Sequence, residues 1–514
     1  MSRAVVALAV ALTSMALFTG ASMPAFAQGN PDLVRQAVDA AGGEAALRAL
    51  KTLRMNGAAR FWEPDQSFVA GGPALFVGDS KLTTTWDFAS GDTRIDWDRG
   101  FVARANVRYS EIATPKFGFV TDDKGSRAMS GIRIATQLRE LQRVSPMLLA
   151  HMLDAGGNVA FEGGLKLNNV VLPAMTFRDG ATTFHVLFNK VTKLPAAVRT
   201  FDEDGVRGTA VFDAVFDGWK PVGGVMVAHT LTYMVADTAV ARINYNDAAA
   251  NAPIDPQAFA ASAEVMASAK PPTTGGVPYQ WVIRRLAFGR FLDSDDVFVP
   301  PGGSLKLTEL ASNVAHVTGG THNGLVVAMK EGVVVFDAPT GGAQSHATLD
   351  AIKAKYDRPV KTLVLTHHHS DHSAGMRVYV AEHAAVLVPA PDRKYFALMA
   401  LAQRPVADDL EKKHVSADIT EISDQMELKD DATEIRLYRV ANQHADGMLI
   451  AHIMPANIVW ESDLWTPGQD TAKSPGAIAL NDALKKFGIS GATIAGGHGA
   501  TAPQAELEKI FAAK

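Results

Sequence analysis

The segment 360–375 reads VKTLVLTHHHSDHSAG, so a short apolar run is followed at once by four histidines and one aspartate. Residues 362–365 have the apolar, β-branched character of a buried strand, and Ser373-Ala374-Gly375 opens a predicted helix. The polar cluster therefore falls on the loop at the C-terminal end of a strand, which is where open α/β sheets place their sites.

The spacing inside this cluster favours metal binding. Side chains at positions i and i+2 of an extended segment point the same way, so His367 and His369 can approach one metal ion together. Asp371 and His372 follow on a tightening turn and can face a second ion. His368 points away and is not counted as a ligand. The alternative, a histidine-rich tract without function, gives no reason for an aspartate and a histidine at that offset after a strand.

The histidine and cysteine counts sharpen this prediction. Only His151, His185 and His229 precede residue 271, so the other twelve of the fifteen histidines lie in the C-terminal part of the chain. The sequence contains no cysteine, which excludes disulfides, thiolate nucleophiles and every zinc site with cysteine ligands. Any metal must be held by histidine and carboxylate.

Length and composition bound the class of protein. A chain of 514 residues, of which 47% are hydrophobic and 20% charged, is expected to form more than one folded domain and is not a disordered protein. A formal net charge of -5 without a dense basic run argues against nucleic acid as a partner.

The first 27 residues resemble a leader rather than part of a fold. Arg3 precedes an almost wholly apolar stretch, 4–18, and Ala25-Phe26-Ala27 forms a small-x-small cleavage signal before Gln28. This pattern predicts a secretory signal peptide and a periplasmic or secreted mature protein. The apolar stretch is shorter than the ~20 residues that a membrane-spanning helix needs, so no stable membrane span is expected.

Residues 28–270 are predicted to form a β-rich, antiparallel domain after a short helical pair within 31–50. Strand-like runs such as 93–97, 182–188 and 239–245 alternate with glycine-containing turn signals, and such runs dominate the stretch 52–259. Proline and glycine clusters at 270–276 and 300–303 indicate a linker, which we place at 271–305. The catalytic domain is then expected over 306–514.

Spaced motifs in the two halves of the sequence resemble those of two known families. Segments 41–45, 215–219 and 254–255 loosely resemble the lipoprotein-localisation-like β domains of exported bacterial proteins, which cradle apolar chains. In the C-terminal half, further motifs follow the 360–375 segment in a fixed order: ANQHADGM with His444, VWESDL with Asp463, and AGGHG with His498, while Asp337 ends two β-rich runs upstream. This order is similar to that of the metallo-β-lactamase superfamily over residues 306–514.

The resemblance implies an α+β protein whose C-terminal half is an αββα sandwich with a dinuclear zinc site. One zinc would take His367, His369 and His444, and the second would take Asp371, His372 and His498. Asp463 would join the two ions. Nitrogen and oxygen donors do not select strongly among metals, so iron or manganese stays open.

Differences from the ligand sets of particular subfamilies narrow the range of activities that the resemblance implies. Thiolate-ligated β-lactamases carry a cysteine where this chain has Asp463, and flavodiiron proteins carry a glutamate where it has His369. The ligand set looks like that of glyoxalase II and the acyl-homoserine lactonases. A β-lactamase of the all-histidine type remains an alternative, because it shares every ligand except the bridging aspartate.

The implied reaction is hydrolysis of an ester, lactone or amide in a small-molecule substrate, with an apolar substrate as one option that the β-rich half suggests. Two metals ~3.5–4 Å apart share a hydroxide as nucleophile, and Asp371 carries a proton to the leaving group. Because the histidine ligands must be neutral, activity is expected to fall below about pH 6.

Three further residues are candidates for substrate contact: His322 in a glycine-rich loop, Trp465 close to Asp463, and Tyr395 in a later helix. An alternative hypothesis from a different functional class is that the protein is a periplasmic lipid- or polymer-binding module with a vestigial metal site. The sequence leaves the physiological substrate and the oligomeric state open.

Overall fold

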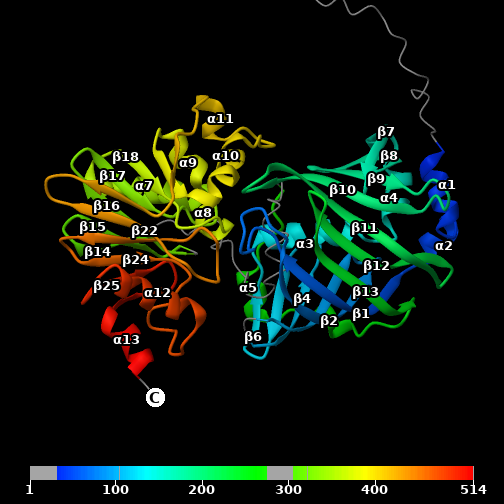
Figure 1. Ribbon diagram of the computed structural model, residues 1–514. Helices are drawn as coiled ribbons and strands as arrows, with labels where there is room; N and C mark the ends of the chain where they lie inside the picture. Colours follow the sequence, from blue (N-terminus) through cyan, green and yellow to red (C-terminus); the bar gives the residue numbers. More distant parts are fainter. Residues whose placement is uncertain (1–31, 103–104, 275–304, 321, 513–514) are drawn as a thin grey trace, which may run out of the picture.

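The structure is a computed structural model that describes residues 32–102, 105–274, 305–320 and 322–512. Figure 1 shows two parts side by side, an N-terminal part coloured blue to green and a C-terminal part coloured yellow-green to red. The predicted leader, 1–27, and most of the predicted linker, 271–305, lie outside the described residues. The predicted fold class, a C-terminal sandwich preceded by a large antiparallel sheet, is confirmed.

The N-terminal part is one antiparallel sheet of thirteen strands in the order β6-β5-β4-β3-β2-β1-β13-β12-β11-β10-β9-β8-β7. Its strands are β1 Thr52–Glu63, β2 Leu75–Asp87, β3 Asp92–Arg99, β4 Val107–Ala113, β5 Gly118–Asp122, β6 Gly125–Ala128, β7 Val159–Leu167, β8 Val170–Asp179, β9 Thr182–Phe188, β10 Pro195–Asp204, β11 Gly208–Val222, β12 Val225–Val235 and β13 Thr238–Ala250. Its helices are α1 Leu33–Ala40, α2 Glu44–Ala49, α3 Gly131–Arg143, α4 Leu148–Asp154 and α5 Ala263–Ser268, with 3-10 turns η1 Gly156–Asn158 and η2 Pro256–Phe259.

Alternation along the strands explains why this stretch forms a sheet with one buried face. In β12 every second residue from Val225 to Val235 is buried, and the residues between them are only partly covered. Gly223 and Gly224, both with positive φ, close the two-residue turn between the paired residues Val222 and Val225. Glycine suits this turn because both central positions need the left-handed backbone region.

Helix α3 lies in the hollow of the curved sheet (Figure 1) and joins strands that are far apart in the sheet order. Arg133 forms a buried ion pair with Glu111 of β4 at 2.7 Å. Arg139 pairs with Asp202 of β10 at 2.8 Å. Because one helix reaches both strands, the sheet must curl around it.

The alternating pattern of this half did not indicate α3 and α4. The buried face of α3 carries Arg133, Gln137 and Arg143, each wholly buried, so polar side chains interrupt the apolar stripe of Ile134 and Leu141. Ser130 caps the helix by accepting from the backbone N–H of Arg133 at 3.2 Å, which is the remaining local signal.

The C-terminal part contains two sheets, β14 to β20 in sequence order and β21 to β26 in sequence order. The first sheet is built from β14 Lys306–Ala311, β15 Val314–Thr318, β16 Gly324–Met329, β17 Gly332–Phe336, β18 Val360–Val364, β19 Ala385–Pro389 and β20 Ile419–Ile422. The second is built from β21 Gln425–Lys429, β22 Glu434–Arg439, β23 Leu449–Met454, β24 Ile458–Glu461, β25 Thr493–Gly496 and β26 Thr501–Pro503. The helices are α7 Gly342–Tyr356, α8 Ser370–Ser373, α9 Met376–Ala381, α10 Arg393–Leu401, α11 Asp409–Lys413, α12 Pro475–Lys486 and α13 Gln504–Ala512, with the 3-10 turn η5 Ala390–Asp392.

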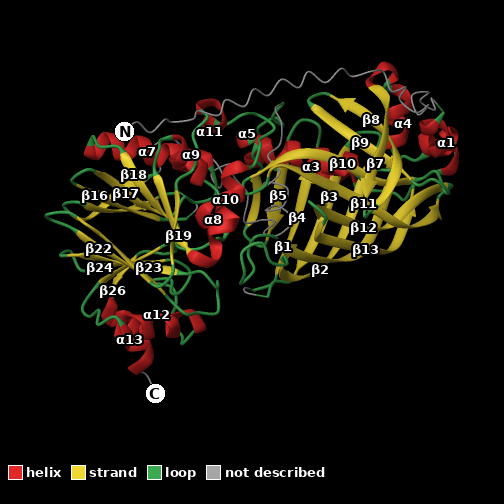
Figure 2. Ribbon diagram, turned by 45° about the horizontal axis from the view of Figure 1, so that its top comes forward, coloured by secondary structure: helices red, strands yellow, loops and turns green. Residues whose placement is uncertain are grey.

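These elements form four layers, as the turned view in Figure 2 shows. One apolar core lies between the sheets and joins Phe336 and Val364 of the first to Leu437 and Trp460 of the second. A second core packs α7, α9 and α10 on the outer face of the first sheet, and a third packs α12 and α13 on the outer face of the second sheet. Each sheet is therefore covered on both faces, which suits the almost wholly apolar strands β16, β17 and β18.

Among the described residues, backbone hydrogen bonds join the two parts of the molecule at two places. The β1–β2 loop, residues 64–74, reaches the C-terminal part, where the N–H of Asp446 donates to the carbonyl of Phe68 at 2.7 Å. The β10–β11 turn does the same, since the N–H of Thr209 donates to the carbonyl of Gln403 at 2.6 Å. Within the described ranges, no helix combines the length and the apolar character needed to cross a membrane.

Candidate metal centre

The histidine cluster is positioned by strand β18 and the short helix α8. Strand β18 runs parallel to both β17 and β19, so the loops at its C-terminal end emerge at one edge of the sheet. Helix α8 begins at Ser370, three residues earlier than the predicted start, so Asp371 and His372 lie on the helix itself. The N–H of Ala338 donates to the carbonyl of His372 at 2.8 Å and fixes this helix against the end of β17.

The structure brings all seven predicted ligands into two adjacent groups. In each group the candidate donor atoms lie within 4.8 Å of one another. One group contains His367, His369, His444 and Asp463, and the other contains His322, Asp371, His372 and His498. The family resemblance implies the same division, with His367, His369 and His444 in one group and Asp371, His372 and His498 in the other. His322 is an additional member of the second group.

Asp463 lies between the two groups. Its Oδ2 is 2.9 Å from Nε2 of His372, 3.2 Å from Nε2 of His367 and 3.4 Å from Nε2 of His444. Its Oδ1 is 2.6 Å from Nε2 of His498. Asp463 adopts a left-handed backbone conformation with φ 59° just after β24, and this turn directs its carboxylate toward both groups.

The chemistry of the donor atoms fits a pair of divalent cations. Among the candidate ligands, four buried imidazole nitrogens form no well-formed hydrogen bond with the described residues: Nδ1 of His369, and Nε2 of His367, His372 and His444, which face Oδ2 of Asp463. Buried polar atoms are nearly always satisfied, so imidazole nitrogens gathered around a carboxylate without well-formed hydrogen bonds fit the binding of a divalent cation. Imidazole and carboxylate suit zinc and other first-row metals.

The opposite nitrogens of the His367, His369 and His372 rings do have partners, which orients these three rings. Nδ1 of His367 lies 3.1 Å from Oγ1 of Thr366, and that hydroxyl donates to Asp337 at 2.9 Å. Nδ1 of His372 lies 3.0 Å from Oγ of Ser462. A proton held on the outer nitrogen leaves the inner nitrogen free to bind a metal.

Burial and the charge of Asp463 shift the pKa values of the histidines in opposite directions. Burial lowers the pKa of His369 to about 3, with a further contribution from His444, and burial together with His369 lowers the pKa of His367 well below its usual value. Burial also opposes the charge on His372, but Asp463 and two other aspartates outweigh it and raise the pKa of His372 well above its usual value. The pKa of Asp463 is held well below its usual range despite burial, because the imidazoles of His372 and its neighbours surround the carboxylate.

His368 belongs to neither group. Its Nε2 lies 2.9 Å from the carbonyl oxygen of Ser67, and its Nδ1 lies 3.4 Å from a carboxylate oxygen of the fully buried Asp392. The ring therefore supports the ligand loop from behind, in keeping with its exclusion from the predicted ligands.

The three predicted substrate residues lie in different surroundings. His322 is next to the second group, with Nε2 3.3 Å from Oδ2 of Asp371 and its ring 4.7 Å from that of His498. Tyr395 lies on α10 behind the site, with its ring 5.7 Å from that of His368. Trp465 does not lie at the site's surface: it is 3% exposed, packs in the core under α12 and donates its indole N–H to the carbonyl of Asp470 at 3.1 Å.

The sequence did not reveal that the N-terminal domain reaches the metal centre. Nε2 of Gln66 donates to Oδ1 of Asp371 at 2.6 Å. The carbonyl oxygen of Ser67 lies 3.1 Å from Nε2 of His369. Neither residue belongs to a recognisable motif, and a backbone carbonyl carries no signal in the sequence.

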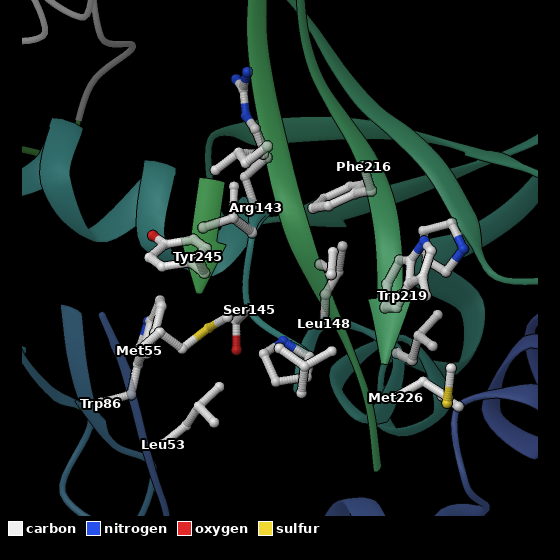
Figure 3. Close-up of a pocket in the computed structure, with 18 residues that line it drawn as sticks. Leu53, Met55, Trp86, Arg143, Ser145, Leu148, Phe216, Trp219, Met226 and Tyr245 are labelled. Carbon is white, nitrogen blue, oxygen red and sulfur yellow. The ribbon is translucent and has the colours of Figure 1, made fainter. Parts of the chain in front are cut away.

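A separate apolar pocket lies at the other end of the N-terminal domain. Leu53, Met55 and Trp86 line one side, and Phe216 and Trp219 line the other (Figure 3). The guanidinium group of Arg143 points away from the hollow in this view. The pocket lies beside α1 and the β11–β12 turn, away from the C-terminal part in Figure 1, so it is not continuous with the metal centre.

Comparison with known proteins gives one family match and a set of similar solved structures. Residues 317–502 match the family described as the metallo-beta-lactamase superfamily. Among solved structures, a metallo-beta-lactamase from Pontibacter korlensis is 18% identical with a TM-score of 0.32, covering 41% of this chain and 100% of that one. One from Hirschia baltica is 17% identical with a TM-score of 0.32, covering 40% of this chain and 96% of that one. No curated protein matches the chain. On the matched motif order and the αββα architecture, residues 317–502 of this chain form a domain of the metallo-beta-lactamase superfamily.

Proposed function

We propose that this protein is an exported hydrolase that uses two divalent metal ions, zinc above all, to cleave an ester, lactone or amide bond in a small molecule. The observation that carries the proposal is the pair of histidine and aspartate groups that meet at Asp463, in which four buried imidazole nitrogens form no well-formed hydrogen bond with the described residues.

His367, His369 and His444 would hold one ion, and Asp371, His372 and His498 would hold the other, with Asp463 between them. Divalent cations bound there would supply a water of lowered pKa as the nucleophile and would polarise the scissile carbonyl. The same donors accept iron or manganese.

The residues of the chain contribute orientation and proton transfer. Asp371 is held from two sides, by the amide of Gln66 on Oδ1 and by His322 3.3 Å from Oδ2. A carboxylate fixed in this way at the edge of the site is suited to carry a proton to the leaving group. The bridging position of Asp463 supports esters and lactones over β-lactams, because the all-histidine β-lactamases do not use such an aspartate.

Export is part of the proposal and rests on the pattern of residues 1–28. It is tested by expressing the full chain in a bacterium, separating the periplasmic fraction and sequencing the N-terminus of the protein found there. We expect a mature protein that begins at or near Gln28. A chain that keeps Met1 and stays in the cytoplasm would contradict export without affecting the hydrolase proposal.

The hydrolase proposal is tested with purified protein on chromogenic esters, lactones, thioesters and a chromogenic cephalosporin, together with metal analysis. We expect about two metal ions per chain and hydrolysis of an ester or lactone, with a loss of at least ~100-fold in His369→Ala. His346→Ala is the matched control, because this ring is 52% exposed and lies outside both groups.

Two outcomes would favour the alternatives. Cephalosporin turnover far above that of every ester and lactone would identify a β-lactamase. A metal content well below two, with no hydrolysis of any substrate, would instead support a lipid- or polymer-binding module with a vestigial site.

A further inference from the structure

The β1–β2 loop, residues 64–74, joins the N-terminal sheet to the metal centre. The last paired residues of the hairpin are Glu63 and Leu75, so the loop protrudes beyond the sheet. Besides the contact of the Ser67 carbonyl with His368, its tip makes three contacts with the ligand-bearing loops. Gln66 donates to Asp371 at 2.6 Å, the carbonyl of Ser67 lies 3.1 Å from Nε2 of His369, and the carbonyl of Phe68 accepts from the N–H of Asp446 at 2.7 Å.

The loop is held in this position by its own base. Asp65 adopts a left-handed conformation with φ 61° and is 5% exposed. Both its carboxylate oxygens pair with the guanidinium of Arg207, at 2.7 and 2.8 Å. Arg207 belongs to the β10–β11 turn, and the neighbouring carbonyls of Asp204 and Gly205 accept from Arg404 of the C-terminal domain. The two contact places thus support one another, and the loop is anchored rather than free.

The contact with His369 determines which nitrogen of that ring is available. A neutral imidazole carries one N–H and one bare nitrogen. A carbonyl can only accept, so the 3.1 Å contact with Ser67 places the proton on Nε2. Nδ1 is then bare, and it is buried and makes no hydrogen bond with the described residues, so it is the nitrogen that His369 can offer to the first group. The contact with Gln66 acts on the second group in the same manner, because it occupies Oδ1 of Asp371 and leaves Oδ2 toward His322 and His372.

We propose that the β1–β2 loop is a positioning element for the metal centre: the carbonyl of Ser67 orients His369, and the amide of Gln66 orients Asp371. The N-terminal domain therefore completes the outer hydrogen-bond shell of a site whose ligands all come from the other domain. This inference rests on the proposed function, because it assumes that the two groups bind metal. Outer partners of metal ligands typically change metal affinity ~10–100-fold.

The first test removes a single donor. Gln66→Met keeps the length of the side chain but cannot donate, so Oδ1 of Asp371 loses the hydrogen bond from the Gln66 amide. We expect one of the two zinc ions to bind ~10-fold more weakly in competition with a chromogenic chelator. The matched control is Gln142→Met, which removes an amide-to-carboxylate hydrogen bond of the same type, to Asp179, far from the metal centre.

The second test removes the whole loop. Replacing residues 64–74 with Asn-Gly closes the hairpin between the paired residues Glu63 and Leu75, because the Asn-Gly dipeptide favours a two-residue turn. We expect ~10–100-fold weaker binding of both ions and a changed visible absorption spectrum of the cobalt-substituted protein, since both ligand groups lose a partner. Circular dichroism and thermal unfolding of the metal-free protein show whether the variant is folded. If it is not, Gln66→Met alone decides the matter.

The outcomes separate this inference from the proposed function. Wild-type protein that binds two ions, with affinities and a cobalt spectrum unchanged in the folded variants, would overturn the positioning role and leave the hydrolase proposal intact. Wild-type protein that binds no metal would overturn both. Weaker binding in Gln66→Met and in the loop replacement, but not in Gln142→Met, would establish the role.

Discussion

At the scale of single residues, Asp463 has the greatest weight in the metal centre. One carboxylate lies within 3.4 Å of four imidazoles that come from three separate loops and one helix. No charged side chain of opposite sign other than these imidazoles is found beside it in the described part of the chain. The arrangement is therefore stable only when protons or metal ions supply positive charge.

Asp463→Asn tests this role. The amide has the same shape but no charge, so we expect the metal content to fall from about two ions to about one and the hydrolytic rate to fall at least ~100-fold. The measurements are metal analysis after dialysis and the rate on the best ester or lactone. Asp482→Asn on the exposed face of α12 is the control and should change neither. Two tightly bound ions in Asp463→Asn would contradict a bridging role.

The residues that come together in the two groups could be predicted from the sequence, but their hydrogen-bond partners could not. Four of the seven lie in one motif, and the others follow strand ends in a fixed order, so pattern and spacing were sufficient. The hydrogen bond from Gln66 to Asp371 joins residues 305 positions apart. Trp465 was expected at the substrate because it follows Asp463, yet an apolar ring next to a site is as readily used to build the core beneath it.

At the scale of elements, the short helix α11 shows how one carboxylate serves two purposes. Asp408 caps α11 in a capping box with Glu411. It also binds the guanidinium of Arg377 from α9 with both oxygens, at 2.6 and 2.9 Å. Burial alone would raise the pKa of Asp408, but the bonds from Arg377 and the N–H of Glu411 outweigh it and lower the pKa.

This pair predicts a pH-dependent stability. Asparagine remains a good cap, so Asp408→Asn removes mainly the charge that neutralises the buried Arg377. We expect the variant to be less stable than wild type by ~1–3 kcal/mol at pH 7. Since the pKa of Asp408 is lowered by folding, its contribution is present above its unfolded value of ~3.9 and is lost as the pH falls through the folded value.

Denaturant unfolding of the metal-free protein at pH 7 and near pH 3 measures the effect. The difference between wild type and Asp408→Asn should shrink at the lower pH. Asp409→Asn, the next residue and more exposed, serves as the control and should cost little at either pH. An equal difference at both pH values would mean that the charge of Asp408 is not responsible.

Strands were easier to predict than helices in the N-terminal domain. Runs such as 182–188 alternate clearly, and the structure has β9 at those residues. Helix α3 was missed although Ile134, Leu138 and Leu141 recur at helical spacing, because buried arginines and a glutamine interrupt this apolar pattern. The partners of those side chains, Glu111 and Asp202, lie on distant strands and are known only once the sheet has curled.

At the scale of the whole molecule, the two domains are joined by few but polar contacts. Arg404 is buried at the second contact place and donates to the carbonyls of Asp204 and Gly205. Such charge-assisted bonds contribute ~1.5–3 kcal/mol each. Proline and glycine clusters predicted a boundary between the domains, but nothing in the sequence indicated which surfaces would meet, because the contacting residues lie in turns of ordinary composition.

Arg404→Met tests the coupling between the domains. The substitution leaves two carbonyls without their donor, so we expect the unfolding transition of the less stable domain to fall by several degrees, at ~2–4 °C per kcal/mol for a domain of this size. Differential scanning calorimetry of the metal-free protein provides the measurement. Arg436→Met, on the exposed face of β22, is the control. If neither transition moves, the contact does not couple the domains.

The length of chain between Gln66 and Asp371 also sets an order of events. Residues 305 positions apart that belong to different domains meet only when the domains dock, and domains generally fold as units before they dock. Both domains must therefore reach nearly their final shape before the β1–β2 loop can dock. The metal centre is then among the last regions to acquire its final geometry, and the uptake of tightly bound metal reports the maturation of the entire chain rather than the folding of the catalytic domain alone.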